Sequence, residues 1–102
     1  MNAKRENIME SRETIERMAA CTRRTLNIHG PLTLDILIQK LDLLGISCVA
    51  EENMNEDAYT TVVLSDDTLF EIHYASQRKE EHILFSVSVE FGKILLLYIN
   101  RS

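Results

Sequence analysis

Long apolar runs are missing from this chain of 102 residues, and none approaches the ~18 residues that a helix needs to cross a membrane. No apolar stretch follows the basic residues at the start, so a secretory signal is not expected. Glycine occurs three times, always isolated, which excludes a glycine-rich loop that could cradle a phosphate. With 45% hydrophobic and 26% charged residues, the chain is expected to form a single globular domain spanning residues 1–102.

Cysteine is scarce as well, with only Cys21 and Cys48. Their spacing matches no metal-binding pattern, and neither has an identifiable base nearby in sequence that would make it a nucleophile. We therefore expect two free thiols in or near the core, as in a cytoplasmic protein, in preference to a disulfide.

Few residues after position 24 carry a positive charge. The net charge is −5; residues 25–102 hold five Lys or Arg against twelve Asp or Glu. Direct nucleic-acid binding is not expected, because phosphate contacts need clustered Lys and Arg. The acidic stretches EENMNED and SDD lack the ligand spacing of a calcium loop and are expected to be solvated loops.

Periodicity predicts two helices followed by three strands. Residues 5–27 carry one apolar stripe and are expected to end at Gly30 and Pro31. A second helix should begin at the N-cap Thr33 and end at Gly45. Strands are expected at 46–50, 59–64 and 69–74, the last two antiparallel because a short turn joins them. The buried face of the second helix is predicted to consist of Leu34, Leu37, Ile38, Leu41 and Leu44.

The segment FSVSVEFGKILLL, residues 85–97, fits two structures. Its first half alternates like a strand, and Gly92-Lys93 could turn it back as a β-hairpin that extends the sheet. As a helix, it would place on one broad face Leu84, Val87, Phe91, Ile94, Leu95 and Tyr98. The local pattern slightly favours the strand.

Taken in order, the elements resemble the ImmA/IrrE family of small zincin-like metallopeptidases. GPLTLDILIQKLDLLGISCV matches the family's entry helix and first strand, and LFEIHY matches its last strand. ILFSVSVEFGKILLL falls on the active helix, of the type F-S/T-I-A-His-Glu-L-Gly-His-x-L-L. The resemblance implies an α+β fold with two N-terminal helices, a small three-stranded antiparallel sheet and a C-terminal helix. All three helices are expected to pack on that sheet.

The same resemblance implies a degenerate and truncated active site. Glu90 falls on the general base, whereas Val89 and Lys93 replace the two histidines that would bind zinc. Valine has no lone pair, a lysine ammonium repels a cation, and the third ligand has no position before the chain ends. We therefore expect no bound metal, no cofactor and no catalysis. Lys93 is expected to pair with Glu90, either as an ordinary helix salt bridge or as a cation in the place of zinc.

Three histidines remain, His29, His73 and His82, and each is expected to be an ordinary surface or strand residue, although a site built from His73 or His82 with Glu90 is conceivable. The function implied is an inactive metallopeptidase-like protein that binds a repressor or other regulator of a phage or conjugative element. The alternative is a small acidic chaperone or inhibitor that binds a basic protein surface, which a strand at residues 83–99 would favour.

Overall fold

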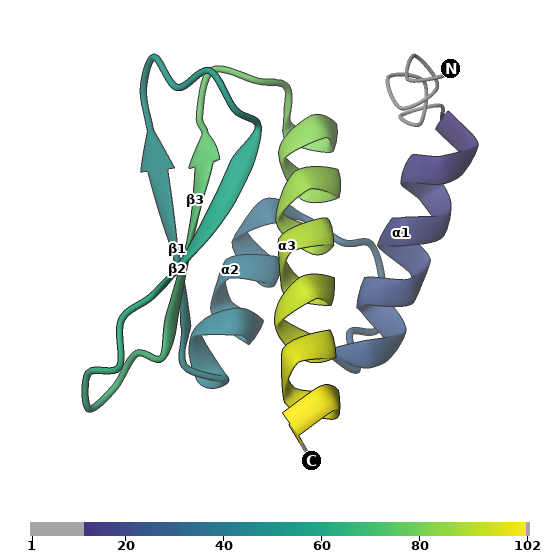
Figure 1. Cartoon of the computed structure of the whole chain (residues 1–102). Coiled ribbons are helices and arrows are strands. Elements are labelled where there is room, and N and C mark those ends of the chain that lie inside the picture. Colours follow the sequence, from purple (N-terminus) through teal and green to yellow (C-terminus); the bar gives the residue numbers. More distant parts are fainter. Residues whose placement is uncertain (1–11, 102) are drawn as a thin grey trace, which may run out of the picture.

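The computed structural model describes residues 12–101, which fold into three helices and a three-stranded sheet (Figure 1). The predicted α+β class and the order α-α-β-β-β-α are confirmed, and the ambiguous last segment is a helix. Among these residues, no helix is long and apolar enough to span a lipid bilayer. The elements are α1 (Arg12–Thr25), α2 (Leu34–Leu43), β1 (Ile46–Glu51), β2 (Ala58–Val62), β3 (Phe70–Ala75) and α3 (Glu80–Arg101).

Helix α1 ends at Thr25, earlier than the sequence predicted, and a different residue forms its C-terminal cap. Asn27 adopts the left-handed conformation with φ 56°. Its N–H donates to the carbonyl of Arg24, and the Ile28 N–H donates to that of Arg23. These two bonds form a Schellman motif, in which asparagine takes the position that glycine most often holds. The cap assigned to Gly30 is therefore wrong, and residues 5–11 of the predicted helix lie outside the described part of the chain.

Helix α2 begins and ends as predicted. The Thr33 hydroxyl accepts a hydrogen bond from the Ile36 N–H at 3.3 Å, which confirms the N-cap. A second cap comes from α3, because the Glu80 carboxylate accepts from the Leu34 N–H at 3.0 Å. Gly45 follows the helix with φ 82°, a conformation that glycine adopts without strain. Leu37 and Leu41 are fully buried, but Leu44, predicted to be buried, is 51% exposed.

The sheet is mixed, so the prediction of a wholly antiparallel sheet is wrong. The strand order is β1-β3-β2; β2 pairs antiparallel with β3 as predicted, whereas β1 pairs with β3 in parallel. The most buried strand, β3, takes the centre, where Ile72 and Ala75 are fully buried. The loop after β1 leads to β2 on the other side of β3. After the turn at the end of β2, the chain enters β3, which runs parallel to β1 between the two.

In the described part of the chain, the helices cover one face of the sheet only. α2 packs on β1, α3 packs on β3 and β2, and α1 lies along α3 as an outer layer (Figure 1). α1 was expected to pack on the sheet, which is wrong: it packs on α3 instead. The side chains that meet between the sheet and the helices form a single core: Leu37, Leu41, Ile46, Ile72, Tyr74, Ile83, Val87, Phe91 and Ile94.

Candidate functional site

Glu90 lies on the face of α3 that turns toward β2, and its side chain is only 10% exposed. Oε1 accepts a hydrogen bond of 2.7 Å from the Thr60 hydroxyl of β2, and Oε2 accepts one of 3.0 Å from Lys93 Nζ. A buried carboxylate needs such partners, because an unpaired charge loses its hydration without compensation. Both oxygens of the predicted general base are therefore occupied by side chains of the chain itself.

Val89 and Lys93 stand four residues apart on α3, on the side beside Glu90. The predicted pairing of Lys93 with Glu90 is confirmed, while the Lys93 side chain stays 65% exposed. Val89 is half-buried and offers no lone pair. These side chains do not fit a zinc ion, because one cannot coordinate it and the other carries positive charge.

A shallow hollow of about 400 Å³ lies next to Glu90, between β2 and α3. Its lining combines carboxylates with apolar surface and no basic side chain: Glu56, Asp57, Ala58, Phe85, Ser86, Val89 and Glu90. We name it the β2–α3 hollow. An anionic ligand would find no positive partner among these lining residues, and the chemistry of the hollow suits an extended segment with apolar and basic side chains.

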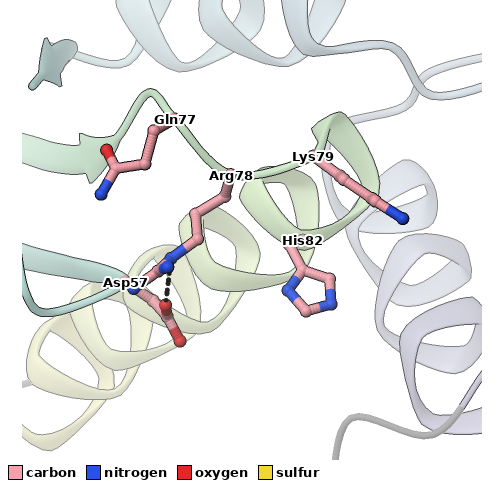
Figure 2. A pocket seen from close by; sticks show the side chains of 5 residues that line it. All are labelled: Asp57, Gln77, Arg78, Lys79 and His82. Atoms are coloured by element: carbon pink, nitrogen blue, oxygen red, sulfur yellow. Dashed lines mark hydrogen bonds and ion pairs between the residues drawn. The ribbon is translucent and has the colours of Figure 1, made fainter.

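A second hollow, of about 480 Å³, opens at the start of α3 (Figure 2). Arg78 crosses it and donates from Nε to Asp57 Oδ1 at 3.0 Å and from a terminal nitrogen to the Asn55 carbonyl. Lys79 and His82 point away from that pair (Figure 2). The ion pair holds the loop before β2 against the start of α3, and Glu80 and Glu81 in the first turn disfavour an anion.

The open face of the sheet carries its own polar cluster, centred on His73. Nδ1 lies 2.7 Å from Glu51 Oε2, and Nε2 lies 3.1 Å from Glu71 Oε1. Tyr59 stacks on the ring with centroids 4.7 Å apart. The two carboxylates approach opposite ring nitrogens, so they cannot converge with His73 on one ion.

The conceivable site built from His73 or His82 with Glu90 is not formed within the described residues. His73 lies on the sheet face opposite to α3, and His82 lies eight residues before Glu90, about 12 Å along the helix axis. His29 is exposed in the loop after α1. Across residues 12–101, no three His, Cys, Asp or Glu side chains are grouped so as to hold a metal ion.

Both cysteines are free thiols, as predicted, but they differ in environment. Cys21 is exposed on α1, which corrects the expectation of a core thiol there. Cys48 packs against the core, where burial, helped by the charge of Asp42, raises its pKa to about 11. A thiol with a raised pKa is a poor nucleophile at neutral pH.

Sequence reasoning found Glu90 and Lys93 but missed Thr60, Glu51 and Glu71 as partners. Alternation in LFEIHY does place Glu71 and His73 on one face of a strand. Glu51 and Thr60 reach their partners through pairing and packing between distant segments. No local pattern reports such contacts.

The fold and this site define a class: an α+β domain with a mixed sheet, whose last helix carries a buried carboxylate that accepts a hydrogen bond on each oxygen. Comparisons with protein-family models, with curated proteins and with solved structures found no match to the chain. The ImmA/IrrE resemblance therefore stays a prediction, carried by the residues quoted for it.

Proposed function

We propose that this protein is a catalytically inactive, metallopeptidase-like regulator that acts by binding another protein. The observation that carries the loss of catalysis is the double occupancy of Glu90 by Thr60 and Lys93. These bonds hold the carboxylate against Thr60 and Lys93, and the side chains beside it supply no metal ligand that would activate a water for a general base to deprotonate. Val89 beside it supplies no metal ligand in the position that the resemblance gives to histidine.

The free edge of β2 supports protein binding. Within residues 12–101, β2 pairs with β3 alone, and the bonded pairs at its two ends join Asp57 to Ala75 and Val63 to Leu69. Hydrogen bonds alternate along an antiparallel pair, so the N–H and C=O groups of Ala58, Thr60 and Val62 face away from β3. Such an edge can accept an added strand, whose side chains would alternate between the open sheet face and the β2–α3 hollow.

The partner we propose is a repressor or other regulator of a phage or conjugative element, as the resemblance implies. The negative lining of the β2–α3 hollow supports a segment that carries Lys or Arg. The alternative is an acidic chaperone or inhibitor unrelated to peptidases, and the net charge of −5 supports it. Its other support, a strand at residues 83–99, is wrong because that segment lies within α3.

The test uses the purified chain and the helix-turn-helix regulator encoded next to its gene. We expect a stable complex by size-exclusion chromatography with light scattering, and an uncut regulator by intact mass spectrometry. Thr61→Arg would place a long cation on the open face beside the free edge and should weaken the complex, whereas Gln39→Ala, at an exposed position on α2, should not. A regulator cleaved in a zinc-dependent reaction that Glu90→Gln abolishes would refute the inactive assignment, and absence of any complex would refute the partner.

A further inference from the structure

Exposed apolar side chains concentrate at one end of the molecule. Among the described residues, six of the nine large hydrophobic side chains that are exposed lie where α2 ends and where β2 turns into β3. Leu43 is 79% exposed and Leu64 is 74% exposed. We name this surface the apolar end, made of Leu43, Leu44, Val62, Val63, Leu64 and Leu69.

Backbone hydrogen bonds tie the two segments of the apolar end together. The Gly45 carbonyl, just after α2, accepts from the Leu69 N–H at 2.8 Å. The Leu69 carbonyl in turn accepts from Val63 at 2.9 Å and from Leu64 at 3.4 Å. The end of α2 and the β2–β3 hairpin therefore lie at the same end of the molecule (Figure 1). The exposed leucines belong to an ordered surface.

Leu64 adds an independent observation. Its φ of 58° is a left-handed conformation, which costs free energy for a leucine and suits glycine or asparagine. Burial does not offset this strain, because the side chain is 74% exposed. With so much of its side chain in solvent, Leu64 gains little from packing within residues 12–101. Its apolar side chain is explained by contact with another molecule.

The charge around the apolar end indicates which kind of partner it can bind. Asp42, Asp66 and Asp67 lie within two residues of the apolar end in sequence, are exposed, and form no ion pair within residues 12–101. A second copy would bring the same three carboxylates and a like net charge of −5, which opposes self-association. We propose that the apolar end docks a partner segment in which apolar anchors are flanked by Lys or Arg. That the segment belongs to the regulator bound by this protein rests on the function proposed above.

The first experiment uses a defined probe, a leucine/lysine amphipathic peptide, with its leucine/glutamate counterpart as the charge control. Binding is followed by fluorescence anisotropy, and its location by amide chemical-shift mapping. We expect the lysine peptide alone to bind, with the largest shifts around Leu44, Leu64 and Leu69. Leu43→Ser combined with Leu64→Asn should weaken it about tenfold, since anchors dominate such interfaces. Asn tolerates the left-handed conformation, so this variant should fold.

The matched control is Leu96→Ser with Leu97→Ser, two leucines on α3 that are 58% and 50% exposed. It should change the affinity by less than about twofold. Equal weakening in both variants, equal binding of the glutamate peptide, or shifts confined to another surface would overturn the proposal. So would a concentration-dependent dimer, seen by sedimentation, that the Leu43→Ser, Leu64→Asn variant abolishes.

The regulator itself separates the two proposals. If the regulator binds wild type and the Leu43→Ser, Leu64→Asn variant equally well, the apolar end is not its docking surface, while the proposed function stands. If the lysine peptide binds at the apolar end but no regulator does, the surface stands and the proposed partner fails.

Discussion

Carboxylates on the two opposite faces of the sheet are stabilised by different hydrogen-bond partners. On the covered face, Glu90 is 10% exposed and relies on Thr60 and Lys93. On the open face, Glu51 and Glu71 are 38% and 35% exposed and flank His73. Water can replace a lost partner on the open face, whereas on the covered face the chain itself must supply one.

The face of the sheet on which a polar contact lies, more than its residue types, determines how much free energy the contact contributes to stability. Thr60 and Thr61 are neighbours in β2, yet Thr60 donates to Glu90 at 2.7 Å while Thr61 lies 3.5 Å from His73 Nε2 on the open face. A bond to a buried charge contributes about 1.5–3 kcal/mol, and an exposed contact much less.

Thr60→Val is expected to give the largest effect in this comparison. The substitution keeps the shape of the side chain but leaves Glu90 Oε1 buried without a donor, which should cost about 2–3 kcal/mol of unfolding free energy. Thr61→Val is the matched control and should change stability by no more than about 0.5 kcal/mol. Urea unfolding at neutral pH measures both. Equal losses would mean that the two faces do not differ as described.

The Cys48 thiol should make stability fall at alkaline pH. Burial raises its pKa from 9.0 in the unfolded chain to about 11 in the folded one. The folded state therefore holds the proton longer, so stability is complete below pH 9 and declines as the pH rises to 11. We expect a loss of roughly 2 kcal/mol, somewhat under the full linkage value because the thiol is half-buried.

Urea unfolding at pH 8 and pH 10.5 checks this, with Cys48→Ala as the control that should flatten the slope. Tyr74, whose pKa is also raised by burial, would account for any slope that the variant retains. In the folded protein at pH 8, the exposed Cys21 should react rapidly with a thiol reagent and Cys48 slowly. Equal labelling rates would contradict the difference in burial.

Local patterns predicted much of the fold. The cap at Thr33, the stop at Gly45 and the β2–β3 hairpin depend on residues close in sequence, and each was placed correctly. The parallel pairing of β1 with β3 was missed because it joins segments more than twenty residues apart. The end of α1 was missed because Asn27, less common in that role than glycine, forms the cap.

For the candidate site, the helical frame predicted the Lys93–Glu90 pair, since residues three apart share a helix face. Thr60 could not be predicted, because its approach to Glu90 depends on how α3 packs over β2. The exposure of Leu44 was missed for a related reason. Its periodicity places it with Leu37 and Leu41, but it lies past the last turn of α2, beyond the reach of the core.

Ser88 is the polar group on the helical side for which the described structure provides no partner. It is 2% exposed, and its hydroxyl makes no hydrogen bond. Ser88→Ala should therefore raise the unfolding free energy by about 1 kcal/mol, by removing an unsatisfied group and improving helix propensity. Ser86→Ala, at a half-buried position on the same helix, should give only a few tenths. Destabilisation by Ser88→Ala would indicate that its hydroxyl has a partner in solution.

The smallest effect distinguishes the two interpretations of Lys93. As an ordinary helix ion pair with its ammonium largely in water, it contributes less than about 1 kcal/mol and weakens in high salt. As a cation in the place of zinc, Lys93 would balance the charge of Glu90. The coupling energy between the two side chains would then be about 2 kcal/mol or more and would change little in high salt. A double-mutant cycle of Lys93→Met and Glu90→Gln, measured by urea unfolding in low and high salt, isolates the coupling. The 65% exposure of Lys93 predicts the small, salt-sensitive value. A large, salt-resistant coupling would show that Lys93 balances the charge of Glu90 as a cation in the place of zinc.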